Sequence, residues 1–333
     1  MLTRLDSFSE WFEAWLAAQH PWTSTYGWAR TLLATGTILT LLLNHTDILF
    51  RTGSGLTERV FCGAVSFMSL FCLVPVEHLE VARYVAIAGL LVVISGWRPR
   101  FTGLIHFYVS YSLHATALIV DGGDQVTTVL TLLLLPVTLT DPRRSHWQTG
   151  QSAESGYLWR QVSAWVAITA LFTIRVQIAI IYLVAATAKM AVPEWVDGTA
   201  LYYWLSSPYI GIPRDTFVWS LLEPALSSGF VALITWSALL LELLLAGALF
   251  SSQPYRRWLF YPGIAFHIAI ALLMGITSFS IAMCGALILH LWPAGRQRVR
   301  SDRPNEEVSA PGRAQEGTWI AVSVRAGDGQ EAE

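Results

Sequence analysis

The chain has 333 residues and a formal net charge of -2; 54% of its residues are hydrophobic and only 13% are charged. Soluble domains carry about 25% charged residues. With a mean hydropathy of +0.49 and 15 tryptophans, the composition excludes an ordinary soluble domain and predicts a membrane protein. The sequence shows no basic patch of the kind that binds nucleic acid.

The first 25 residues lack the basic, apolar and small-residue regions of a cleavable signal peptide. Their apolar side chains instead recur at helical spacing, with acidic residues between them: Leu5, Phe8, Phe12, Trp15 and Leu16. This pattern predicts an amphipathic helix at residues 1–25 that lies in the membrane interface.

Nine apolar stretches follow, each close to the ~20 residues that a helix needs to cross a bilayer. They lie at residues 26–48, 60–76, 81–97, 101–120, 126–140, 172–190, 229–250, 258–276 and 279–293. The sixth belongs to an apolar segment of about 30 residues, 161–190, which we interpret as an interfacial approach followed by one crossing. The sequence therefore predicts an all-α fold, a polytopic transmembrane helical bundle of about nine spans over residues 26–293.

The charges of the short loops predict the orientation of these spans. Arginines fall in the loops at 51–59, 98–100, 141–160 and 253–257, whereas acidic residues dominate the loops between them. Cytoplasmic loops are rich in Lys and Arg, so we expect the N-terminus outside the cell membrane and the C-terminus in the cytoplasm. Residues 294–333, rich in Arg, Glu, Gly, Pro and Ser, are expected to form a disordered cytoplasmic tail.

The three cysteines, Cys62, Cys72 and Cys284, all lie in apolar stretches and form no CxxC pair. We interpret them as small core residues and expect neither a disulfide nor a cysteine-bound metal. The sequence also has no HExxH motif and no phosphate-binding loop, so no metal site is predicted.

The stretch from 171 to 203 concentrates polar residues within a helix of membrane length. Arg175, Tyr182 and Lys189 recur every seven residues, which keeps them near one stripe of the helix. A charged side chain at the bilayer centre costs between ~3 and ~17 kcal/mol, so such residues face a protein interior or a wet cavity. After Lys189, Pro193 and Trp195 mark a break in the helix and the start of a surface segment.

Depth along the helices suggests which polar residues meet. At ~1.5 Å per residue, Arg175 lies ~21 Å below Lys189, and Glu242 lies ~20 Å below the outer face. We therefore expect a structural ion pair between Arg175 and Glu242. His267 at ~13 Å and His114 at ~9 Å below that face are within reach of Lys189. Each histidine is either a hydrogen-bonded packing residue or part of a site around Lys189.

Lys189 itself has two interpretations. A lysine at a helix end can extend its amine to the lipid headgroups as an anchor. In a dry cavity the same amine is a candidate catalytic base. Spacing alone does not choose between them.

Several runs resemble known families. YLVAATAKMAVPEWVDG at 182–198 resembles a signature of the vitamin K-dependent γ-carboxylase-like HTTM family. The segment from His267 to Met283 resembles its second signature, a His followed at a fixed distance by Phe-Ser and Met. YGWARTLLATGTILTLLLN near the start and DGGDQ at 121–125 resemble more closely the bacterial branch named for sporulation-delaying protein B. The resemblance covers residues 20–293.

The resemblance implies a site at Lys189. The family lysine is regarded as the base that deprotonates vitamin K hydroquinone, which makes Lys189, His267 and His114 catalytic candidates. Tyr182 and Trp195 then become candidate contacts of a vitamin K-like quinol cofactor. The bacterial branch is associated with maturation or export of a secreted antimicrobial peptide, which implies a small peptide precursor as a partner. The carboxylase's large lumenal domain has no counterpart in this sequence, so carboxylation of protein glutamates is not expected.

Three hypotheses result. The first is a membrane protein that helps to mature or export a small secreted peptide, with an active-site cavity around Lys189. The second is a quinol-dependent membrane oxidoreductase or carboxylase that uses Lys189 as base. The third is a non-catalytic membrane scaffold. Residue pattern and composition alone indicate only a polytopic helical membrane protein with one polar outer cavity.

Overall fold

The computed structural model describes residues 20–50, 62–148 and 157–292. The chain divides into two compact units, 1–297 and 298–333, and all described residues belong to the first unit. The expected disordered tail and nearly all of the expected interfacial helix at 1–25 lie outside the described residues.

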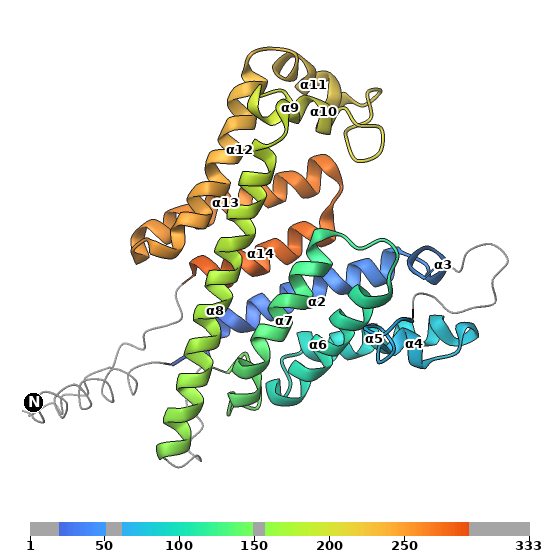
Figure 1. The fold of residues 1–333 in the computed structure, drawn as a ribbon, viewed down its shortest axis with the longest axis vertical. Helices are drawn as coiled ribbons and strands as arrows, with labels where there is room; N and C mark the ends of the chain where they lie inside the picture. Colours follow the sequence, from blue (N-terminus) through green and yellow to red (C-terminus); the bar gives the residue numbers. More distant parts are fainter. Residues whose placement is uncertain (1–19, 51–61, 149–156, 293–333) are drawn as a thin grey trace, which may run out of the picture. The chain divides into compact units, whose positions relative to one another are not determined.

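Within the described ranges the chain is helical (Figure 1), and the single strand-like pairing there is an antiparallel bridge between Trp97 and Ser145. Its long helices are α2 Ser24–Leu43, α5 Leu79–Ile94, α6 Pro99–Thr116, α7 Gly122–Thr140, α8 Tyr157–Met190, α12 Phe230–Gly247, α13 Gln253–Met274 and α14 Thr277–Leu291. Shorter elements are α3 Thr46–Leu49, α4 Leu70–Leu73, η1 Val76–His78, α9 Pro193–Val196, α10 Ala200–Leu205, α11 Phe217–Leu226 and η2 Ala248–Phe250. The all-α prediction is confirmed for this part of the chain.

Four of the described helices are long and apolar enough to cross a membrane: α7, α8, α12 with its extension η2, and α13. They support the prediction of a membrane protein. The predicted number of nine spans is not confirmed. α5 and α14 have only 16 and 15 residues, and α2 and α6 carry polar residues such as Arg30 and His106 within apolar sequence.

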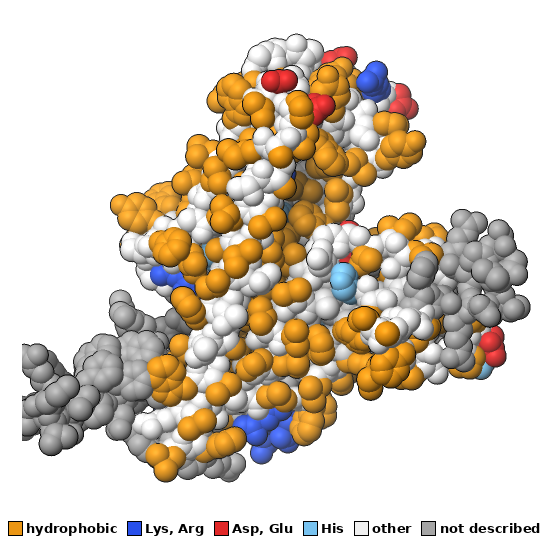
Figure 2. Space-filling model, in the orientation of Figure 1, with side chains coloured by type: hydrophobic (Ala, Val, Ile, Leu, Met, Phe, Trp, Pro, Cys, Tyr) orange, Lys and Arg blue, Asp and Glu red, His pale blue; other side chains and the backbone are white. Residues whose placement is uncertain are grey.

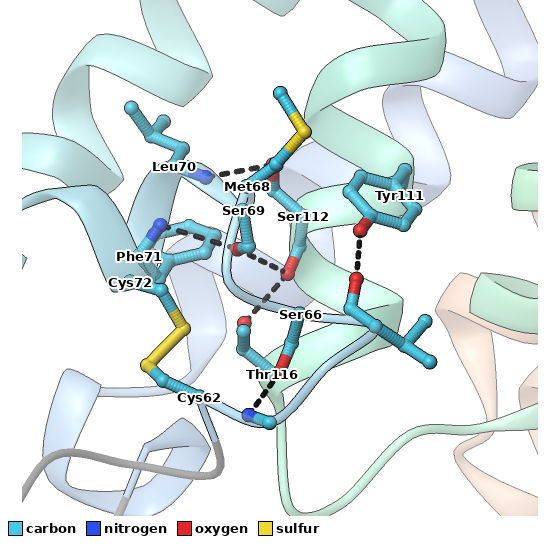
Figure 3. Close-up of a disulfide and its surroundings, with 12 residues drawn as sticks. Cys62, Ser66, Met68, Ser69, Leu70, Phe71, Cys72, Tyr111, Ser112 and Thr116 are labelled. Carbon is cyan, nitrogen blue, oxygen red and sulfur yellow. Dashed lines mark hydrogen bonds between the residues drawn. A yellow bond between two sulfur atoms is a disulfide. The ribbon is translucent and has the colours of Figure 1, made fainter.

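The predicted span at 60–76 is wrong over its described residues, 62–76. This segment contains the one-turn helix α4 and reverses direction (Figure 3). Hydrogen bonds tie it to α6. Among them, Ser69 Oγ donates to the Ser112 carbonyl at 3.1 Å, and the Leu70 N–H donates to Ser112 Oγ at 3.0 Å. Within the segment, the Gly63 and Phe71 N–H groups donate to Ser66 Oγ and Ser69 Oγ. Serine hydroxyls with such local backbone bonds favour turns over a continuous helix, and hydropathy does not register that preference.

The expectation of three reduced cysteines is wrong for two of them. Cys62 and Cys72 form a disulfide across ten residues of sequence (Figure 3). Both cysteines lie in the reversing segment, so the turn that replaces the predicted span also brings the two sulfurs together. Cys284 on α14 is free, as expected.

α2 is central to the packing of the described unit, with α14 and α5 among its main neighbours. Small residues let α2 and α14 approach closely. A Cβ added at Gly285 would lie 3.1 Å from the carbonyl oxygen of Ala29, and one at Gly36 would lie 3.1 Å from that of Ser278. Close contact through small residues is a common way for membrane helices to pack without a hydrophobic driving force.

α8 and α12 reach different levels at the end that carries α9, α10 and α11 (Figure 1). α8 ends at Met190, near the predicted break, and α9 begins at Pro193. α12 extends beyond Met190, the last residue of α8, and its second turn lies beside α9. A hydrogen bond marks this contact: Trp236 Nε1 donates to the Val196 carbonyl at 3.1 Å. This offset decides which residue of α12 faces the end of α8.

Acidic and basic side chains gather at opposite ends of α8. Figure 2 shows acidic side chains predominating around α9–α11 and basic side chains near the end where α8 begins. Hydrophobic side chains are spread over the face between these two ends in Figure 2, as expected for a surface that contacts lipid.

Candidate functional site

A cavity of about 600 Å³ lies where α8 ends and α7 begins. Side chains from α7, α8, α9, α10, α12, α13 and α14 line it, and most of them are apolar. The polar side chains in its wall are Gln125, Gln177, Tyr182, Lys189, Glu242 and His267. Among the described residues, no group of three or more His, Cys, Asp or Glu is placed to hold a metal ion.

Lys189 and Glu242 form an ion pair in this wall. The Lys189 amine donates to both carboxylate oxygens of Glu242, at 2.7 and 2.9 Å. The Glu242 side chain is 7% exposed and that of Lys189 is 28% exposed, so Lys189 is the more accessible partner. The amine also lies 5.5 Å from the Trp195 ring, a cation–π contact. Because the pair is neutral overall, each charge lowers the cost of placing the other in an apolar wall.

The structure pairs Glu242 with Lys189 and not, as predicted, with Arg175. The prediction assumed that the last residue of α8 and the first residue of α12 lie at the same depth. In the structure, the first turns of α12 extend beyond the last residue of α8. Glu242 is therefore level with Lys189. Arg175 lies deeper, where its Nε donates to the His290 carbonyl at 3.1 Å.

Tyr182 and His267 form a second polar pair in the cavity wall. The Tyr182 hydroxyl lies 2.9 Å from His267 Nε2, and both residues are buried. His267 Nδ1 has no hydrogen-bond partner among the described residues. This nitrogen is buried, and a buried polar nitrogen without a partner is costly.

The cavity gathers Lys189, His267, Tyr182 and Trp195 from the predicted site. His114 is not among its lining residues. It lies on α6, whose main packing partners are α5 and α7. A similar depth in the membrane therefore did not bring His114 to Lys189.

A second polar cluster, not identified from the sequence, lies where α2 begins and α7 ends; we call it the inner network. The Tyr26 hydroxyl donates to Asp141, and Arg143 pairs with Asp141 at 2.8 Å. Arg30 Nη1 lies 3.2 Å from His146 Nδ1. All five residues are at most 4% exposed. Burial and the guanidinium groups of Arg30 and Arg143 lower the pKa of His146 to about 3.

Comparison with known proteins identifies relatives over most of the chain. YitO of Bacillus subtilis (strain 168) is 40% identical over 277 residues, which cover 83% of this chain and 87% of YitO. The sporulation-delaying protein SdpB of the same organism is 40% identical over 283 residues, covering 84% of this chain and 85% of SdpB. No family model matches the chain, and no solved structure matches it.

Proposed function

The chain belongs to the family of the Bacillus subtilis proteins SdpB and YitO, and we propose on this premise that it helps to mature or export a small secreted peptide at the cell membrane. The observation that carries this proposal is the cavity of about 600 Å³ around Lys189. Its apolar walls suit peptide side chains. Its polar groups suit the peptide backbone or a terminal carboxylate.

Each polar group has a role in this proposal. Lys189, whose side chain is partly exposed, donates from its amine to a carbonyl or carboxylate of the peptide, while Glu242 keeps the amine in place. His267 is held against the Tyr182 hydroxyl in the same wall. Trp204 of α10 lines the cavity and its neighbour Tyr203 is exposed, which suits an entrance at the membrane interface, where aromatic residues are common.

The proposal includes an orientation. We take α2, α5, α6, α7, α8, α12, α13 and α14 as eight crossings. Arginines then share the face at the starts of α6 and α13 and after α7: Arg98, Arg100, Arg143, Arg144, Arg256 and Arg257. Under the positive-inside rule that face is cytoplasmic. The cavity and the disulfide of Cys62 and Cys72 then face outside, where disulfides persist. Both ends of the membrane unit are cytoplasmic in this arrangement, which revises the expected external N-terminus because segment 62–76 does not cross.

A quinol-dependent reaction is the second candidate function, favoured by the aromatic residues in the cavity wall. Trp195 and Phe279 offer ring faces and edges to a flat ring, and two polar pairs suit its hydroxyl groups. The residues present therefore fit a quinol, which would supply reducing electrons. Lys189 donates to Glu242 in the structure, so its use as a base requires that Glu242 first accept the proton.

Substitution of Lys189, the only lysine in the sequence, tests the two functions. Cells that make a peptide precursor would express Lys189→Ala, Lys189→Arg or the wild type at equal membrane levels, with mature peptide and quinol oxidation measured in parallel. Peptide binding through positive charge predicts that Lys189→Arg keeps peptide release and Lys189→Ala loses it. General-base chemistry predicts that both variants are inactive, because a guanidinium does not give up its proton. Unchanged peptide release by Lys189→Ala would contradict peptide binding through Lys189, and unchanged quinol oxidation by either variant would contradict general-base chemistry.

A further inference from the structure

Arg175 has no acidic partner in the described part of the chain. None of the four ion pairs there includes it. Its one hydrogen bond goes to the backbone, from Nε to the His290 carbonyl. A guanidinium within an apolar span is expensive without a counter-charge. An anion from outside the described residues would supply that charge.

Arg175 lines a second cavity, of about 200 Å³, between α2, α8 and α14. The hydroxyl-bearing residues Thr23 and Thr25 line it as well. So does Phe172, which is 58% exposed on the surface of α8. The cavity therefore borders the surface that faces lipid, and its volume suits a small polar group more than an acyl chain.

We infer that this cavity reaches from the apolar part of α8 to the headgroup region. It adjoins the start of α2 and the end of α14, where Trp22 and Trp292 flank the two helices. Trp292 lines the cavity, and the guanidinium of Arg257 lies 5.8 Å from its ring. Tryptophans and arginines at helix ends mark the boundary between the hydrocarbon and the headgroups.

We propose that this cavity binds the headgroup phosphate of an anionic phospholipid, with Arg175 as its charged contact. Guanidinium groups donate two parallel hydrogen bonds to phosphate oxygens. A lipid reaches the cavity sideways from the bilayer, and its acyl chains then run along the exposed surface of α8 beside Phe172. Basic pockets between membrane helices bind anionic headgroups in this way. The proposal is independent of the function of the cavity at Lys189.

The test compares the purified protein in phosphatidylcholine nanodiscs with and without phosphatidylglycerol. We expect phosphatidylglycerol to raise the melting temperature of the wild type and to remain bound in native mass spectra. Arg175→Gln should weaken phosphatidylglycerol binding about tenfold, since one charge-assisted hydrogen bond accounts for that much affinity. Arg144→Gln, an equal charge change at an exposed arginine of the same face, should bind like the wild type.

A second variant leaves Arg175 in place. Ile168→Trp fills the cavity and should also abolish the phosphatidylglycerol effect, even if Arg175→Gln is too unstable to purify. Inorganic phosphate added to phosphatidylcholine nanodiscs should have no effect. The proposal is overturned if phosphate alone reproduces the stabilisation, if phosphatidylcholine acts as well as phosphatidylglycerol, or if Ile168→Trp responds like the wild type.

Discussion

The inner network and the cavity at Lys189 both place charged groups inside an apolar bundle, but they differ in what surrounds those groups. In the inner network, Asp141 is enclosed by Tyr26 and Arg143, and all three side chains are buried. In the cavity, the Lys189 side chain is partly exposed beside open space. Charge within a membrane segment therefore does not by itself mark a site. A cavity lined by several polar side chains is the feature that distinguishes the site at Lys189.

The largest effect is expected in the inner network. Asp141→Asn keeps the shape of the side chain but removes the charge that Arg143 pairs with. A buried guanidinium without its partner costs ~3–5 kcal/mol, so the variant should melt far below the wild type in detergent. Asp47→Asn, at an exposed acid on α3, is the control and should melt normally. Near-normal melting of Asp141→Asn would show that the network does not hold the fold.

The disulfide is expected to contribute ~2–3 kcal/mol, as a short closed loop does. The paired variant Cys62→Ser/Cys72→Ser should melt lower than the wild type, whereas Cys284→Ser should not. On intact cells, a membrane-impermeant maleimide should label these two cysteines only after reduction. Labelling that requires permeabilised cells would place the disulfide in the cytoplasm and reverse the proposed orientation.

The ion pair at the cavity should contribute less than the inner network, because Lys189 is partly exposed to solvent or lipid headgroups. A double-mutant cycle with Lys189→Met and Glu242→Leu should give a coupling of about 1–2 kcal/mol. The parallel cycle with Arg175→Met and Glu242→Leu should be additive, because those side chains do not pair. Coupling in the second cycle and additivity in the first would restore the sequence-based pairing.

The smallest effect concerns pH. Folding lowers the pKa of His146 from an ordinary value near 6.5 to about 3. Between these values the unfolded chain binds a proton that the folded chain does not, so stability decreases as the pH falls. From pH 7 to 6 the loss should be ~0.7 kcal/mol. His146→Asn should remove this part of the pH dependence, measured as the difference in melting between the two pH values; an unchanged slope would contradict the assignment.

The sequence predicted the helical class and most of the long helices, because apolar length and spacing report burial directly. It also identified Lys189, Tyr182, Trp195 and His267, which line one cavity. Three of these lie within one local stretch and need little tertiary information. The predicted pair of Arg175 and Glu242 was wrong because it depended on the relative depth of α8 and α12, which the sequence does not give.

Contacts between residues far apart in the sequence were the second limit on what could be predicted. Arg30 was visible as a charge in an apolar helix, but its partner His146 is 116 residues away in a segment with no regular pattern. The turn that pairs Cys62 with Cys72 was hidden because its apolar composition matches that of a span. Composition records how apolar a segment is and not whether its serines bond to the backbone.

The most direct test of the cavity as the functional site fills it without substituting its polar side chains. Ala185 lines the cavity, whereas Ala188 on the same helix is exposed and outside it. Mature peptide would be measured in the medium of cells that make a peptide precursor together with Ala185→Trp, Ala188→Trp or the wild type, at equal membrane levels. Our account predicts that Ala185→Trp abolishes peptide release and Ala188→Trp preserves it. Full release by Ala185→Trp, or equal loss in both variants, would contradict it.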